Sequence, residues 1–257
     1  MARKGARRHL KRLAAPRNWR IPRGRYSWAV RPHCGPHPIN TSMPLLNLVK
    51  LVLAPSYTAR EARHVLFQGK VLIDGVKRSD YKFPVGLMDV VSVPATDRVY
   101  RILPLPVRGL TLHPIAKTEA GFKLCRVISK VSTRGGNLQI NLHDGRNILV
   151  KKDEANKELS SVKTHDTLKI EVPSQKIIET VKYEQGTLVL ISGGKNVSMI
   201  GRVEKIHEPK GANLSTDVSL RISEEKTIEV PRDYTFAIGK EESLISYPKP
   251  EEQQDKQ

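Results

Sequence analysis

The sequence has few cysteines, few aromatic residues and no long apolar run, and each shortage excludes a class of protein. Its two cysteines, Cys34 and Cys125, are too few for a disulfide framework, which fits a reducing cytoplasm. No apolar run approaches the roughly 20 residues that span a bilayer, so we expect no membrane partner. Aromatic residues make up only 5% of the chain, so stacking on bases cannot be the main means of binding a nucleic acid.

Acidic residues are also missing from the first part of the chain. The first acidic residue is Glu61. The 13 Lys or Arg residues before it supply 13 positive charges of the chain's net charge of +18. Such a block repels itself, so we expect residues 1–41 to form a basic extended arm that needs a polyanion, while the modules from Ser42 onward fold without it. A transit peptide is the alternative, since it is also rich in Arg and poor in acids. Trp19, Trp28 and the proline-rich RPHCGPHP run do not fit its amphipathic helix.

Two helices and a hairpin are predicted after the arm. Ser42 is expected to cap a helix with a continuous apolar face that ends at Pro55. Thr58 and Glu61 form a capping-box pattern, which predicts the start of a second helix. Asp74-Gly75 lies between two short apolar runs, which indicates a hairpin with a primed turn.

Short strands dominate the rest of the chain, so the fold class is α+β and mostly β. Runs of Val, Ile and Leu are separated by turn sequences such as RGGN and DG, which predicts a central β-meander and then further short strands. The last residues lack apolar periodicity. The predicted modules are the arm at 1–41, a helix-and-hairpin unit at 42–106, a central β domain at 107–175, a small β domain at 176–240 and a flexible tail at 241–257.

The helix-and-hairpin unit carries a cluster of basic residues. Arg60, Arg63 and His64 have i, i+3 and i+4 spacing, so they share one side of the second predicted helix. Further cations, Lys70, Lys77 and Arg78, come from the adjoining hairpin. A basic helix beside a basic hairpin is typical of a surface that binds structured RNA through its shape and phosphates. The alternative is an ordinary solvated face.

The run Gly193-Gly194-Lys195 suggests a phosphate-binding loop, but its spacing excludes one. A Walker loop needs a glycine five positions before the Gly-Lys pair, where this chain has Val189, and a hydroxyl residue after the lysine, where it has Asn196. We expect a tight turn between strands that exposes Lys195 to an RNA backbone. A turn without a partner is the alternative.

Several stretches resemble known RNA-binding families. ARHVLFQGKVLIDGVKRSDYKFPVGLMDVVSV resembles the small RNA-binding domain called alpha-L, and the stretch from Gly186 to Ile206 resembles the KOW motif, which forms part of a small β-barrel. Together with the basic arm, GFKLCRV and YTFAIGK, their order resembles the small-subunit ribosomal proteins called S-four-e, from about Arg3 to Lys240.

This resemblance implies a non-catalytic, structural constituent of the small ribosomal subunit in the cytoplasm. It implies a monomer without cofactors, bound to small-subunit rRNA and to neighbouring small-subunit ribosomal proteins, and it identifies the C-terminal module as a KOW-type small β-barrel. The residues expected to contact rRNA are Arg3, Lys4, Arg7, Arg8, Lys11, Arg12, Arg17, Trp19, Arg20, Arg23, Arg25, Trp28, Arg31, His37, Arg60, Arg63, His64, Lys70, Lys77, Arg78, Lys195 and Arg202. Val197-Ser198-Met199 adds no cation to the loop after Lys195, so contact there depends on Lys195 and Arg202.

Three alternatives remain at this stage. His33, Cys34 and His37 could bind zinc, although structural zinc sites usually bring paired ligands from two separated turns. A pseudouridine synthase would share the alpha-L unit, but its catalytic Asp follows Arg-Leu, a context that this chain lacks. A non-ribosomal regulatory or processing factor could use the KOW unit for a polymerase or exosome partner, and sedimentation with small subunits would distinguish it.

Overall fold

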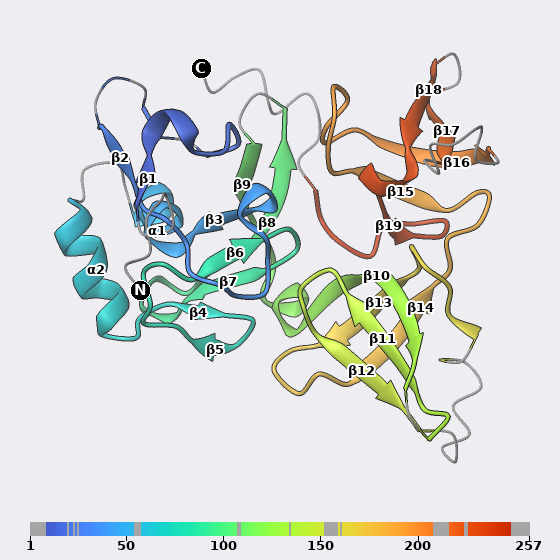
Figure 1. Ribbon diagram of the computed structural model, residues 1–257, viewed down its shortest axis with the longest axis horizontal. Coiled ribbons are helices and arrows are strands. Elements are labelled where there is room, and N and C mark those ends of the chain that lie inside the picture. The colour runs from blue at the N-terminus through green and yellow to red at the C-terminus, as the bar shows by residue number, and fades with distance from the viewer. Residues whose placement is uncertain are drawn as a thin grey trace, which may run out of the picture. The chain divides into compact units, whose positions relative to one another are not determined.

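The computed structural model describes residues 9–247 apart from 20, 23, 25, 54–57, 107–108, 134, 152–158, 160, 208–215 and 224–225. The chain divides into two compact units, with the boundary after Gly121. Both consist mainly of antiparallel sheets, and the helices α1 (Leu45–Leu53) and α2 (Ala59–Phe67) belong to the first (Figure 1). The expectation of a mostly β fold is thus confirmed. No helix in the described ranges is long and apolar enough to cross a membrane.

The first unit is built on a five-stranded antiparallel sheet in the order β5-β4-β7-β8-β9. Two short antiparallel pairs, β1 with β2 and β3 with β6, accompany it. The strands of this unit are β1 (Leu10–Lys11), β2 (Trp28–Ala29), β3 (Ser42–Pro44), β4 (Leu72–Ile73), β5 (Val76–Lys77), β6 (Pro84–Gly86), β7 (Val90–Val93), β8 (Arg98–Leu105) and β9 (Gly109–Pro114).

Of three local structures predicted from the sequence, two are confirmed and one is wrong. The capping box at the start of α2 is present in both directions, from Thr58 and from Glu61. Asp74 and Gly75 both adopt positive φ, 49° and 74°, as a primed turn between β4 and β5 requires. Ser42, however, does not cap α1. It lies in β3 and pairs with Gly86, because pairing with β6 buries both Ser42 and the following Met43. The predicted helix end at Pro55 lies outside the described residues.

The expectation of a separate N-terminal arm differs from the structure over residues 9–40. Trp19 is 2% exposed and Ala15 is 7% exposed, and both belong to the same core as α1 and the sheet. The indole nitrogen of Trp19 donates a hydrogen bond to the carbonyl oxygen of Ser42 at 2.6 Å. Burial of apolar side chains outweighs the repulsion among the cations that flank them. This part of the chain is therefore built into the first unit.

The boundary placed between residues 106 and 107 also differs from the structure. Strand β9 begins at Gly109 and pairs along its length with β8, so it completes the first sheet. Gly109 has a φ of 66° and lies against Asn18, whose carbonyl oxygen would be 2.4 Å from a Cβ at this position. A glycine is needed here because the N-terminal segment passes so close to the start of β9.

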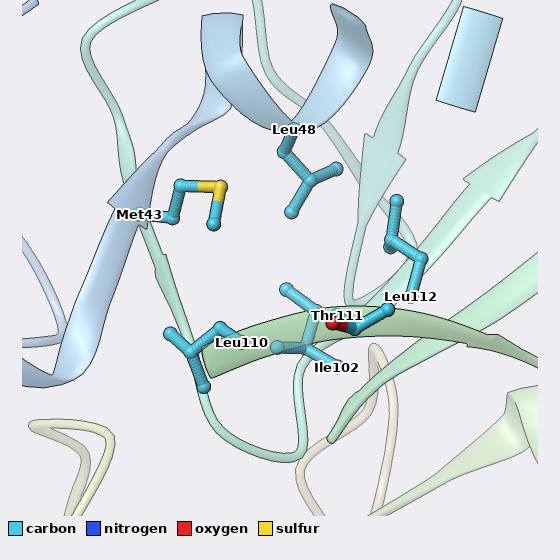
Figure 2. A pocket seen from close by; sticks show the side chains of 6 residues that line it. All are labelled: Met43, Leu48, Ile102, Leu110, Thr111 and Leu112. Carbon is cyan, nitrogen blue, oxygen red and sulfur yellow. The ribbon is translucent and has the colours of Figure 1, made fainter. Parts of the chain in front are cut away.

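A small pocket lies within the core of the first unit. It has room for about 10 Å³ and is lined by Met43, Leu48, Ile102, Leu110, Thr111 and Leu112. Figure 2 shows Leu48 reaching from α1 toward the strands that carry Ile102 and Leu110. The hydroxyl oxygen of Thr111 is buried, and none of the residues that the structure describes forms a hydrogen bond with it. A pocket this small and apolar is a packing defect rather than a ligand site.

The second unit contains two five-stranded antiparallel sheets, in the orders β12-β11-β10-β13-β14 and β18-β17-β16-β15-β19. The predicted meander from Cys125 to Val150 is confirmed as β10, β11 and β12. The strands are β10 (Phe122–Ser132), β11 (Leu138–Leu142), β12 (Asn147–Val150), β13 (Thr167–Glu171), β14 (Ile177–Val181), β15 (Leu188–Ile191), β16 (Ile200–Ile206), β17 (Asp217–Ser223), β18 (Lys226–Pro231) and β19 (Thr235–Gly239).

The boundary placed between residues 175 and 176 separates two paired strands. β14 pairs with β13, so it belongs to the first of these sheets. The two sheets are also joined by polar contacts around β19. The Arg126 guanidinium donates to the carbonyl oxygens of Asp233 and Thr235 at 2.6 and 2.9 Å, and the Tyr183 and Thr235 hydroxyls lie 2.9 Å apart. The two predicted β modules therefore form one unit.

Candidate nucleic-acid interface

The two units carry very different charge. The first, up to Gly121, contains 22 Lys or Arg and 6 Asp or Glu, a net charge of +16. The second contains 22 Lys or Arg and 20 Asp or Glu, a net charge of +2. Since a polyanion is attracted by an excess of positive charge, the first unit is the part suited to bind one.

The basic side chains of α2 are exposed because its other side is anchored. Ala62 and Leu66 are fully buried in the core of the first unit. The capping box fixes the helix start, and the Glu61 carboxylate accepts a hydrogen bond from the backbone nitrogen of Thr58 at 2.8 Å. Arg60, Arg63 and His64 are consequently presented to solvent, as their spacing predicted.

These side chains border an open groove of about 850 Å³. The Arg63 guanidinium lies 4.5 Å from the centre of the Tyr81 ring, so a cation–π contact holds it along one wall. Lys70 adds a further exposed cation from the segment that follows α2. The lining consists of Arg60, Glu61, Arg63, His64, Val65, Phe67, Gln68, Lys70, Ser79 and Tyr81.

Two of the predicted hairpin cations lie outside this groove. Lys77 is exposed on β5. Arg78 is half-buried, and its guanidinium lies 4.6 Å from the centre of the Phe83 ring. The structure thus brings four of the six predicted residues of this unit, Arg60, Arg63, His64 and Lys70, into one surface.

The sequence analysis missed Phe67, which lines the same groove and is 82% exposed. A signal for it was present, because Phe67 follows Arg63 by four residues and so lies on the same side of the helix. An apolar residue in a helix commonly packs in the core. Leu66, the neighbouring residue, takes that role.

Apart from Trp19 and His37, the N-terminal residues named as contacts divide into three groups. Lys11, Arg17 and Trp28 are exposed, and Trp28 has 59% of its surface accessible with the Lys11 ammonium 6.0 Å from its ring. Arg12 and Arg31 are half-buried, and Arg12 donates to the carbonyl oxygen of Ile21 at 2.9 Å. The remaining ones, which lie outside the described residues, are Arg3, Lys4, Arg7, Arg8, Arg20, Arg23 and Arg25.

Trp19 and His37 need correction as contact residues, since the fold itself uses both. Trp19 is packed in the core as described above. The His37 side chain is 2% exposed, and its Nε2 lies 3.1 Å from both carboxylate oxygens of Asp89. A Cβ on Gly86 would come within 2.4 Å of this ring, so the histidine is enclosed on that side as well. Neither side chain is accessible to a nucleic acid.

The possible zinc ligands near the N-terminus are directed to different partners. His33 Nδ1 lies 3.1 Å from Asp80, His37 faces Asp89, and Cys34 is exposed. They do not come together. In the described ranges the residues whose ligand atoms lie close enough to hold a metal ion are Cys125, His143 and Asp144 instead.

That second group is a buried polar cluster rather than a metal site. Lys123 Nζ and Arg146 Nε each lie 3.1 Å from Asp144 Oδ2, so two cations already pair with this carboxylate. Burial opposes ionisation of Asp144, but Lys123 foremost, then His143 and Arg146, outweigh it and lower its pKa. Burial raises the pKa of Cys125 well above its usual value, which keeps the thiol protonated and a poor metal ligand.

The glycine turn in the second unit has the expected form. Gly194 adopts a φ of 85°, and a Cβ on Gly193 would lie 2.8 Å from the Tyr234 ring. Lys195 is exposed at the turn, while the exposed Arg202 donates to the carbonyl oxygen of Glu241 at 3.1 Å. These two cations lie in the second unit, whereas the groove beside α2 belongs to the first.

Comparisons with known protein families assign most of the first unit and part of the second to described domains. Three family models match the chain: the RS4NT (NUC023) domain at residues 4–40, the S4 domain at 43–91 and Ribosomal family S4e at 96–177. The groove beside α2 lies within the S4 domain match.

Two relatives match nearly the whole chain. The chain is 44% identical to "Small ribosomal subunit protein eS4" of Staphylothermus marinus and 45% identical to that of Aeropyrum pernix, in each case over 96% of this chain and 98% of the relative. The crystal structure of the 30S ribosomal protein S4e from Thermoplasma acidophilum matches with a TM-score of 0.65 at 31% identity, over 77% of this chain and 95% of the other. On sequence and structure alike, the chain belongs to Ribosomal family S4e.

Proposed function

We propose that this protein is a structural constituent of the small ribosomal subunit and that it binds small-subunit rRNA through the groove beside α2. The observation that carries the proposal is the joining of Arg60, Arg63, His64 and Lys70 in one open groove. The relatives are named as small-subunit proteins, and the groove falls in the segment matched by the S4 domain. The excess of positive charge lies in the same unit.

The groove acts by neutralising phosphates. Folded rRNA brings negatively charged backbones close together, and cations held on a rigid protein surface reduce their repulsion. Arg60, Arg63 and Lys70 are suited to phosphate contacts, since an A-form RNA helix is recognised mostly by its shape and backbone. The exposed cations Lys11 and Arg17, together with Trp28, extend the contact along the N-terminal segment.

The second unit has a different role in this proposal. With a net charge of only +2, it contacts RNA at single points, of which the KOW-type turn with Lys195 is the candidate. Its remaining surface faces neighbouring small-subunit ribosomal proteins. The protein acts without catalysis, as a monomer within the cytoplasmic ribosome.

The test replaces Arg60 and Arg63 by Glu and measures sedimentation with small subunits. Each exposed arginine becomes a repulsive carboxylate, so association should fall while circular dichroism stays unchanged. The matched control replaces Lys176 and Lys226, which are exposed in the second unit, by Glu. It changes the net charge by the same amount. Equal sedimentation of both variants would refute the groove as the contact, and a wild-type protein that stays free of subunits would indicate a non-ribosomal factor.

A further inference from the structure

Phe67 is an unusual residue in a cationic groove. It is the last residue of α2 and is 82% exposed, although Leu66 beside it is completely buried. A single exposed apolar side chain is common on protein surfaces and needs no explanation by itself. Here, however, the ring forms part of a groove whose other side chains include Arg60, Arg63, His64 and Lys70.

The chemistry of the groove restricts what can fill it. Four basic side chains and one carboxylate, Glu61, line it, and the carboxylate accepts a hydrogen bond within the helix cap. The occupant must therefore be anionic. The exposed phenyl ring favours an occupant that also offers an aromatic face, since aromatic rings pair favourably in offset-stacked or edge-to-face geometry. Fully paired RNA supplies phosphates but hides the faces of its bases in the stack.

We propose that the groove takes an unpaired nucleotide of an RNA, with its base stacked on Phe67 and its flanking phosphates on Arg63 and Lys70. This inference rests on the function proposed above and names the RNA feature recognised at the same site. Arg63 is already positioned for a phosphate contact, because its contact with Tyr81 holds the guanidinium at the groove wall. Stacking on aromatic side chains is how unpaired bases in loops and bulges are commonly bound.

The test compares two RNA hairpins that differ by one nucleotide. One stem is fully paired, and the other carries a single unpaired adenine replaced by the fluorescent analogue 2-aminopurine. The wild-type protein should bind the bulged hairpin more tightly and quench its fluorescence. Phe67→Ala should weaken binding to the bulged hairpin by roughly 5-fold or more and leave the paired one unchanged. Phe67→Trp should keep the preference, while Phe67→Leu, which is apolar without an aromatic face, should lose most of it.

The results separate this inference from the function on which it rests. Equal affinity of the wild-type protein for both hairpins, or an unchanged preference in Phe67→Ala, would overturn the stacking role of Phe67. The Arg60→Glu, Arg63→Glu variant reports on the groove as an RNA contact, since it should weaken binding to both hairpins. Because Phe67 is largely exposed, its variants should fold normally, and circular dichroism checks this.

Discussion

Replacing Trp19 by Ala should destabilise the first unit strongly. The indole is 2% exposed, and an aromatic side chain of this size buries roughly 150–250 Å², which at about 25 cal/mol per Å² corresponds to about 4–6 kcal/mol. That figure is an upper bound, because the unfolded chain already covers part of this surface. The change also leaves the Ser42 carbonyl without the indole donor. A loss of about 3–5 kcal/mol in the free energy of unfolding is expected.

Urea unfolding followed by circular dichroism measures this loss. With an m-value of about 2 kcal/mol per M, the midpoint should fall by roughly 1.5–2.5 M. The matched control is Trp28→Ala, since Trp28 is 59% exposed and its removal should change stability by less than about 0.5 kcal/mol. Coinciding midpoints for the two variants would refute the conclusion that the N-terminal segment belongs to the core. Deletion of residues 1–40 should likewise lower the midpoint, contrary to what the sequence alone predicted.

Three further changes test other parts of the structure. Thr111→Val should stabilise the protein by about 1 kcal/mol in urea unfolding, because it removes a buried hydroxyl that has no partner among the described residues. Thr235→Val, which loses hydrogen bonds to Arg232 and Tyr183, should destabilise it by a similar amount. Burial foremost, then Arg232 and Arg126, lowers the pKa of His165 to about 4. Between about pH 4 and 6.5 the folded protein therefore binds fewer protons than the unfolded chain. The free energy of unfolding should consequently rise with pH across that window. His165→Gln should flatten this rise, and an unchanged slope in urea titrations would contradict the assignment. Gly194→Val should cost about 1–3 kcal/mol because Gly194 has a φ of 85°, and ATP or GTP should leave the melting temperature of the wild-type protein unchanged.

The sequence predicted those features that depend on neighbouring residues. The capping box of α2, the Asp74-Gly75 turn and the β-meander are set by patterns within a few residues, and all three were confirmed. The exposed face of α2 follows from helical spacing in the same way. Four of the predicted contact residues accordingly meet in one groove.

Features that depend on distant residues could not be predicted in this way. The charge pattern of the N-terminal segment indicated an extended arm, but the partners that bury Trp19 and His37 lie far along the chain, at Ser42 and Asp89. Likewise, β9 and β14 were placed in the wrong modules because strand pairing depends on the whole sheet. Phe67 was missed for another reason, since its spacing from Arg63 already places it on the exposed side of α2.

The close packing of Asn18 against Gly109 has a consequence for synthesis of the protein. The N-terminal segment is made first, but strand β9, which lies beside it, is made about ninety residues later. The first unit therefore cannot close its core until β9 has been translated, since domains fold as units and contacts between distant segments form slowly. During that interval the cations of the N-terminal segment are exposed on a chain that has not yet folded. Until then these cations can bind nucleic acids non-specifically, since such binding depends on positive charge alone.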